Sequence, residues 1–296
     1  NRANLFITVG RIVLVYLVGY LAFTITREGG IAKIDLMVIG FFLLNGLLTL
    51  FAQPLIYLYE RLFKLVSDVS LLELSDTNSK LLKELSDRAP GTFHHSLQVA
   101  NLAETAANEI GANTLLVRVG ALYHDIGKMN APTYFSENQT GSVSPHEEMP
   151  PDQSAKIIIN HVTEGIEMAK KSKLPDRIID FIRTHHGNSW VYFFYKKAQE
   201  MGDDVDEKDF RYPGPRPFSK ETAILMMADS VEAASKSLRE PTVDKIQQFV
   251  DAVVNKQIDE KQFHDCNITL SEIQTVKKVL SKKLINIYHL RVEYPE

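Results

Sequence analysis

The chain has 296 residues, of which 45% are hydrophobic and 24% charged, with a formal net charge of -4 at pH 7. A chain of this length predicts about two domains. Because there is no basic excess, we expect no nucleic-acid partner. The one cysteine, Cys266, excludes an internal disulfide, which fits a reducing compartment.

Two apolar stretches open the sequence. Residues 36–59 (LMVIGFFLLNGLLTLFAQPLIYLY) carry no charge, and residues 5–26 carry only Arg11. Each stretch is long enough to cross about 30 Å of hydrocarbon as a helix. The alternatives are a buried hairpin of a soluble protein and a signal peptide, but a signal peptide is not followed by a second, longer span. The sequence therefore predicts a transmembrane helical hairpin over residues 1–60, surrounded by membrane lipid.

Charges at the ends of this hairpin indicate its orientation. Arg2 precedes the first span, and Arg61 and Lys64 follow the second. This weak positive bias favours both ends inside, and it predicts a cytoplasmic location for the rest of the chain. Because the first residue is Asn1 rather than methionine, we expect a fragment with further spans upstream. The expectation is a multi-pass protein of the cell membrane.

Beyond the hairpin, apolar residues recur at helical spacing to about Asp87, which predicts a connecting helix over residues 61–89. Proline and glycine in Ala89-Pro90-Gly91 break this pattern. Residues 90–296 contain no long alternating pattern typical of strands, so we expect an all-α domain. Loops are predicted at about 130–153 and 201–218, and an amphipathic closing helix over 271–291.

Histidines and acids within this domain are the candidate metal ligands, although only nine histidines occur in the chain. Steps of three and four residues from His95 reach apolar residues, whereas the same steps from His94 reach polar ones. His95 should therefore point inward and His94 outward. A lone inward histidine is more often an ordinary core residue, but five of them with two buried acids favour a metal site. The candidates are His95, His124, Asp125, His161, His185, His186 and Asp229.

This set of side chains suggests a particular chemistry. Five imidazoles and two carboxylates can hold two divalent ions side by side, with one carboxylate bridging them. Two such ions turn water into a nucleophile and neutralise phosphate charge, as a phosphodiesterase requires. Lys128 follows closely after His124-Asp125, and we expect it to neutralise a phosphate oxygen. The alternative role for Lys128 is a cation at a helix C-terminus.

These residues resemble the HD-domain phosphohydrolase superfamily, whose H…HD…D pattern matches His95, His124-Asp125 and Asp229. His161 and the pair His185-His186 resemble its binuclear branch. The resemblance implies a helical bundle in which Asp125 bridges two ions. It implies one ion held by His95, His124 and Asp229, and another held by His161, His185 and His186. Iron or manganese is implied, and ligation rich in nitrogen suits these metals better than magnesium or calcium.

Flanking segments narrow the resemblance. Residues 84–96 (ELSDRAPGTFHHS), 134–139 (YFSENQ) and 291–295 (RVEYP) are similar to the seven-transmembrane HD family, which includes the PgpH-type cyclic di-AMP phosphodiesterases. Relatives that cleave cyclic di-GMP carry Gly-Tyr-Pro after the double histidine. Here residues 187–190 (GNSW) follow instead, which argues against cyclic di-GMP as the main substrate.

The resulting expectation is a membrane-anchored phosphodiesterase that hydrolyses cyclic di-AMP to pApA with a metal-bridging hydroxide, Asp125 and Lys128 being its catalytic residues. One alternative is another HD phosphohydrolase, acting on cyclic di-GMP, a nucleotide or an alarmone. The other is a membrane sensor that binds a nucleotide without cleaving it. Four aromatic residues are candidates for base stacking or for surface packing: Tyr134, Phe135, Trp190 and Tyr192. A homo-oligomer is left open.

Overall fold

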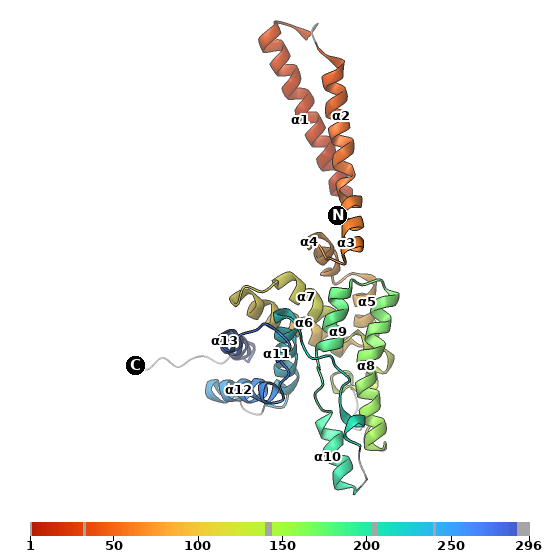
Figure 1. Ribbon diagram of the computed structural model, residues 1–296, viewed down its shortest axis with the longest axis vertical. Helices are drawn as coiled ribbons and strands as arrows, with labels where there is room; N and C mark the ends of the chain where they lie inside the picture. The colour runs from red at the N-terminus through yellow and green to blue at the C-terminus, as the bar shows by residue number, and fades with distance from the viewer. Residues whose placement is uncertain (1, 32–33, 140–143, 203–205, 239–240, 289–296) are drawn as a thin grey trace, which may run out of the picture. The chain divides into compact units, whose positions relative to one another are not determined.

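The computed structural model describes residues 2–31, 34–139, 144–202, 206–238 and 241–288. The chain forms two compact units, residues 1–67 and residues 68–296. Helices make up both units (Figure 1). The described residues contain no β-strand, only an isolated antiparallel bridge between Trp190 and Arg211. The predicted all-α class is therefore confirmed.

The first unit consists of α1 (Arg2–Glu28), α2 (Leu36–Leu50) and α3 (Ala52–Phe63). α1 and α2 pack as a hairpin, in which Tyr16 and Tyr20 contact the ring of Phe42 at 5.3 and 5.9 Å. Residues Leu5–Arg27 and Leu36–Phe63 are long and apolar enough to cross a membrane, with hydropathies of 2.1 and 2.0. Only 6% of each stretch is buried within the protein, so most of its apolar surface is left for other surroundings such as lipid.

The second apolar stretch is interrupted at Phe51, between α2 and α3. Pro54 explains the interruption, because it has no N–H to donate to Leu50 and its ring collides with the carbonyl of that residue in a regular helix. The structure also corrects the predicted connecting helix over residues 61–89. α3 ends where Lys64 adopts a left-handed conformation, with φ 52°. Two short helices follow, α4 (Asp68–Leu74) and α5 (Lys80–Arg88).

A turn separates these two short helices. The Asp76 carboxylate accepts a hydrogen bond from the backbone N–H of Asn78 at 2.9 Å, which stabilises a tight turn in place of another helical turn. Both helices contribute buried leucines to the second unit: Leu71, Leu82 and Leu85. The second unit therefore includes residues 68–89 in addition to the predicted domain over 90–296.

The rest of the second unit is a bundle around α6 (Pro90–Glu109), which packs against α5, α7, α11 and α13. The other long helices are α7 (Thr114–Tyr123), α8 (Pro151–Lys171), α9 (Asp176–Thr184), α10 (Tyr192–Glu200), α11 (Lys220–Ser235), α12 (Val243–Asp259) and α13 (Leu270–Ile287). Fully buried alanines on α6 let its neighbours approach closely: Ala100, Ala103, Ala106 and Ala107.

The predicted loops contain short 3-10 helices: η2 (Ile126–Asn130), η3 (Pro132–Tyr134), η4 (Ser136–Asn138) and η5 (Glu207–Phe210). The predicted closing helix corresponds to α13, which buries Ile273, Val276, Leu280 and Leu284. The last residues of that prediction, and the segment 291–295 that resembles the family, lie outside the described residues.

Candidate metal centre

Five helices of the second unit bring the candidate ligands together. His95 lies in the second turn of α6 and Asp229 lies on α11. His124 ends α7 and Asp125 follows it directly, while His161 lies on α8. His185 ends α9 and His186 comes next. All of these side chains are buried except that of His186, which is half-buried.

Gly127 brings the segment that carries Asp125 against α8. A Cβ at this position would lie 1.8 Å from the backbone oxygen of His161 and 2.7 Å from the nitrogen of Gly165. Only glycine allows η2 and α8 to approach this closely. The contact places Asp125, which directly precedes η2, beside the candidate ligand His161 on α8.

Backbone carbonyls orient three of the histidines. In each of them Nδ1 donates to the carbonyl three residues earlier. The pairs are His124 with Ala121 (2.7 Å), His161 with Ile158 (2.5 Å) and His185 with Ile182 (2.8 Å). Because a carbonyl only accepts, Nδ1 carries the proton and the lone pair of Nε2 faces the centre. Metal-binding histidines are commonly oriented in this way.

A carboxylate orients the fourth histidine. Nδ1 of His95 donates to Oε2 of Glu232, a residue of α11 that our sequence analysis missed. Nε2 of His95 then lies 2.9 Å from Oδ1 of Asp229. Glu232 follows Asp229 by three residues and so lies on the same face of α11, a spacing that could have identified it from the sequence.

The two carboxylate oxygens of Asp125 face different groups of histidines. Oδ2 lies 3.5 Å from Nε2 of His95 and 3.2 Å from Nε2 of His124. Oδ1 lies 3.3 Å from Nε2 of His161 and 3.5 Å from Nε2 of His185. A carboxylate in this position can connect two metal ions.

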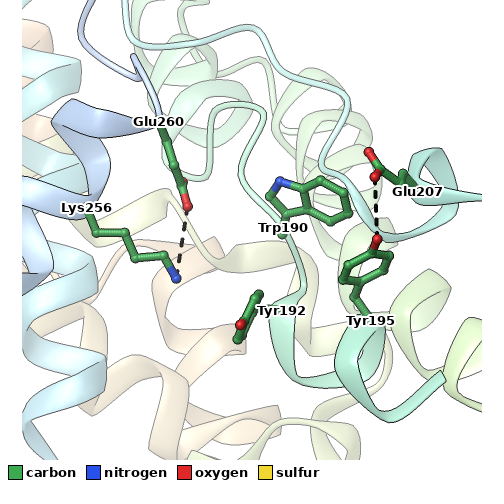
Figure 2. A pocket seen from close by; sticks show the side chains of 6 residues that line it. All are labelled: Trp190, Tyr192, Tyr195, Glu207, Lys256 and Glu260. Atoms are coloured by element: carbon green, nitrogen blue, oxygen red, sulfur yellow. Dashed lines mark hydrogen bonds and ion pairs between the residues drawn. The ribbon is translucent and has the colours of Figure 1, made fainter. Parts of the chain in front are cut away.

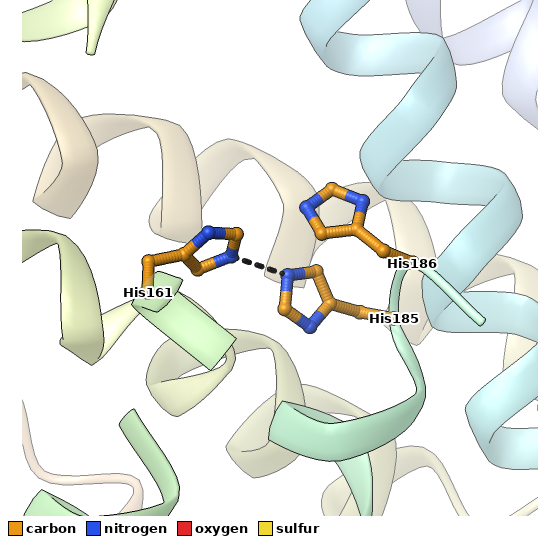
Figure 3. A group of neighbouring side chains, drawn as sticks. All are labelled: His161, His185 and His186. Carbon is orange, nitrogen blue, oxygen red and sulfur yellow. Dashed lines mark hydrogen bonds between the residues drawn. The ribbon is translucent and has the colours of Figure 1, made fainter. Parts of the chain in front are cut away.

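The ligand atoms accordingly form two groups, each with its members within 4.8 Å of one another and each able to hold a metal ion. The first group comprises His95, His124, Asp125 and Asp229, and the second comprises His161, His185 and His186. Figure 3 shows the three imidazoles of the second group converging from α8 and from the end of α9, with Nε2 of His161 3.1 Å from Nε2 of His185.

Charge and burial at the site fit a cation. Burial lowers the pKa of His124, but in the absence of an ion the carboxylates of Asp125 and Asp229 together outweigh burial and raise the pKa to about 10. Burial alone would raise the pKa of Asp229, yet the neighbouring imidazoles of His124 and His95 hold that pKa well below its usual range. Nε2 of His124 and Oδ1 of Asp125 are among the buried side-chain atoms that make no hydrogen bond within the described part of the chain. A divalent ion would coordinate both of these atoms and balance the negative charge of the buried carboxylates.

The second group behaves differently. Burial lowers the pKa of His185, and it holds the pKa of His186 well below the usual range. Both imidazoles are therefore neutral at physiological pH, the form in which histidine binds a metal. The ring of Tyr212 stacks on His186 with the centroids 4.2 Å apart.

Lys128 lies between two carboxylates. Its Nζ is 2.8 Å from Oδ2 of Asp125 and 2.8 Å from Oε1 of Glu137. Glu137 was not among the predicted site residues. No periodicity marked it, because it lies in an irregular segment, and only the resemblance of residues 134–139 included it. His94, by contrast, is exposed and contacts Gln98, as the helical spacing predicted.

The four aromatic candidates for base stacking lie in different surroundings. Phe135 is buried beside the centre, with its ring 5.7 Å from that of His161. Tyr134 contacts His146 instead. Trp190 and Tyr192 line a separate pocket of about 270 Å³, together with Tyr195, Glu207, Lys256 and Glu260 (Figure 2). Arg211 covers one face of the Trp190 ring at 3.9 Å, so only part of that ring is open to a ligand.

Comparison with known proteins identifies the family of the chain. Residues 92–234 match the HD domain family. The chain is 44% identical over 263 residues to the cyclic-di-AMP phosphodiesterase PgpH of Bacillus subtilis (strain 168), which covers 87% of this chain and 37% of that protein. It is 45% identical over 262 residues to the PgpH of Listeria monocytogenes serotype 1/2a (strain 10403S), which covers 88% of this chain and 36% of that protein. The chain thus spans little more than a third of the length of these curated relatives.

A solved structure is also similar. The crystal structure of the L. monocytogenes phosphodiesterase PgpH HD domain in complex with cyclic-di-AMP matches with a TM-score of 0.69 and 48% identity. The match covers 72% of this chain and 99% of that chain. The predicted HD fold and the predicted family are both confirmed, and the chain belongs to the HD-domain family that includes the PgpH phosphodiesterases.

Proposed function

We propose that this chain is the membrane-anchored catalytic part of a metal-dependent phosphodiesterase that hydrolyses cyclic di-AMP to the linear dinucleotide pApA. The observation that carries the proposal is Asp125, whose two oxygens face two separate groups of potential metal ligands. The curated relatives carry the name of this activity, and an HD domain of the family was crystallised with cyclic-di-AMP.

The residues of the centre fit two ions. His95, His124 and Asp229 would hold one ion with Oδ2 of Asp125, and His161, His185 and His186 would hold the other with Oδ1. Nitrogen-rich ligation with carboxylates suits iron or manganese. When bound, two divalent ions supply an activated water, the bridging hydroxide predicted from the sequence, and neutralise the charge of the phosphodiester.

The protein's own groups prepare the site for this chemistry. Glu232 fixes the ring of His95, and Tyr212 covers one face of His186. The ammonium of Lys128 lies on the Oδ2 side of Asp125, where it would stabilise negative charge on a bound phosphate. Asp125 and Lys128 are therefore proposed as the catalytic residues.

We further propose that α1 and the segment from α2 to α3 anchor the chain in the cell membrane as part of a multi-pass protein. Their hydropathy and low burial support this proposal, and the cations at the hairpin ends favour a cytoplasmic HD domain. Lipid is then the partner of the first unit. A homo-oligomer stays a prediction.

The proposal is tested with the full chain, purified in detergent, reconstituted with manganese and incubated with cyclic di-AMP or cyclic di-GMP. Chromatography should show pApA formed from cyclic di-AMP, and Asp125→Asn should form none. Binding of cyclic di-AMP without any product would favour the alternative of a membrane sensor that does not cleave its nucleotide. Faster turnover of cyclic di-GMP would favour the alternative of an HD phosphohydrolase with a different substrate.

A further inference from the structure

Lys128 and Glu137 form an ion pair at the edge of the metal centre. Nζ of Lys128 lies 2.8 Å from Oε1 of Glu137 and 2.8 Å from Oδ2 of Asp125, and it lies over the Phe135 ring at 5.0 Å from the centroid. The side chains of Lys128 and Glu137 are only 13% and 14% exposed. The ammonium is thus held in one place by an acid on each side and a ring beneath.

Glu137 is itself fixed to the start of α6. Its Oε1 accepts a hydrogen bond from the Thr92 hydroxyl at 3.1 Å. Asn138 bonds the same threonine twice, accepting from its backbone N–H at 3.1 Å and donating to its hydroxyl at 2.8 Å. At Gly91, a Cβ would lie 1.8 Å from the Glu137 carbonyl oxygen, so the two segments are in direct contact. Thr92 lies one helical turn before His95, which ties the position of Glu137 to the metal centre.

The carboxylates of Asp125 and Glu137 would interact differently with Lys128 once metal ions are bound. Both oxygens of Asp125 face potential metal ligands, so bound ions would draw its charge away from the ammonium. Glu137 belongs to neither ligand group, and its charge stays available to Lys128. A lysine side chain without such a partner is flexible and would place its charge in solvent.

We propose that Glu137 is a positioning residue, which holds the Lys128 ammonium against the metal centre where the phosphodiester would bind. The inference rests on the proposed function and extends it to a residue outside the ligand set. A rival role is purely structural: Glu137 could do no more than fasten η4 to α6. The two roles differ in one consequence. A positioning residue has no effect on turnover once Lys128 is removed, whereas a structural residue has the same effect with or without Lys128.

A double-mutant cycle on the full chain in detergent, loaded with manganese and given cyclic di-AMP, separates these roles. We expect Glu137→Gln to lower kcat by about tenfold or more, because a displaced catalytic group loses much of its effect, with metal content and thermal unfolding near wild type. In the Lys128→Met background, Glu137→Gln should change kcat by less than about twofold. Equal effects in both backgrounds would overturn the proposal, as would a Glu137→Gln variant with wild-type kcat.

Glu164→Gln is the matched control. The carboxylate of Glu164 accepts from Nδ2 of Asn130 at 2.8 Å, on the same η2 helix that carries Lys128, but it does not contact Lys128 itself. This variant should keep kcat within about twofold of wild type. A loss equal to that of Glu137→Gln would mean that any lost carboxylate around η2 impairs turnover, and it would contradict a specific role for Glu137.

A second measurement is independent of turnover, so that it also holds if the wild type hydrolyses nothing and the proposed function fails. The amine of Lys128 can be acylated by an N-hydroxysuccinimide ester and followed by mass spectrometry, with the exposed Lys83 as internal reference. Relative to Lys83, Lys128 should react at least about fivefold faster in Glu137→Gln than in wild type, since a released ammonium becomes accessible. Unchanged labelling would show that Glu137 does not hold Lys128, whatever the activity.

Discussion

Gly127→Ala should damage the metal centre without removing any ligand. The new Cβ would lie 1.8 Å from the carbonyl oxygen of His161, whereas real Cβ atoms essentially never approach within 3.0 Å. The opposing atoms are backbone, so η2 and α8 must separate by about 1.2 Å, the difference between these two distances. Overpacking of this kind costs about 1–3 kcal/mol of the free energy of unfolding.

The same separation moves Asp125 away from His161, whose Nε2 lies 3.3 Å from Oδ1. Metal–ligand distances tolerate changes of only about 0.2 Å, so a shift of this size should weaken the ion held by the second group more than it weakens the fold. The assay is elemental analysis after dialysis, combined with chemical unfolding of the detergent-solubilised chain. We expect loss of about one ion per chain from a protein that is still folded.

Gly165→Ala is a control variant for this prediction, because its steric clash is milder. Its Cβ would meet the Cγ2 of Ile182 at 3.0 Å and the backbone nitrogen of Gly127 at 3.3 Å, both far longer than the 1.8 Å contact that a Cβ at Gly127 would make. Its effect on metal content and stability should be smaller than that of Gly127→Ala. A Gly127→Ala variant with both ions and wild-type unfolding would refute the claim that this contact sets the distance between Asp125 and His161.

Three further predictions concern the ligands and the substrate. His95→Ala should empty the first ligand group and abolish turnover, whereas His94→Ala should keep near-normal metal content because His94 is exposed. Elemental analysis that shows the reverse order would mean that the inward face of α6 is misassigned. In metal titrations, Asp125→Ala should lower the occupancy of both ions, whereas His161→Ala should chiefly empty one site. An intact high-affinity site in Asp125→Ala would contradict the bridging role of Asp125. Steady-state kinetics should give a kcat/KM for cyclic di-AMP at least about tenfold above that for cyclic di-GMP, or roughly 1.4 kcal/mol, and equal values would overturn the substrate assignment.

Helical periodicity was sufficient to predict that His95 points inward and His94 outward. His95 and His94 are adjacent, yet one is buried and the other exposed, because the apolar spacing along α6 determines its buried face. The same spacing applied to acids would have identified Glu232, one turn after Asp229. Periodicity predicts the face of a single helix well because this face depends only on local geometry.

Other features depend on contacts between distant segments, and the sequence does not indicate them. The two oxygens of Asp125 face two different groups of candidate metal ligands because η2 approaches α8 closely at Gly127, which is a tertiary contact. Glu137 lies in an irregular segment whose position is set by Thr92 and Asn138. The connecting helix over residues 61–89 was predicted wrongly because of local features. The apolar spacing continues along this segment, but the left-handed backbone at Lys64 and the turn at Asp76 end the helices there.

We expect hydrolysis of cyclic di-AMP to require both of the ions that Asp125 would bridge. The most direct test titrates metal-free chain with manganese while bound metal and pApA formation are measured on the same samples. We expect little turnover at one ion per chain and a steep rise in rate as the second ion binds, because two ions together stabilise the attacking and the leaving oxygen. Full activity with one bound ion, or hydrolysis that does not depend on added metal, would contradict it.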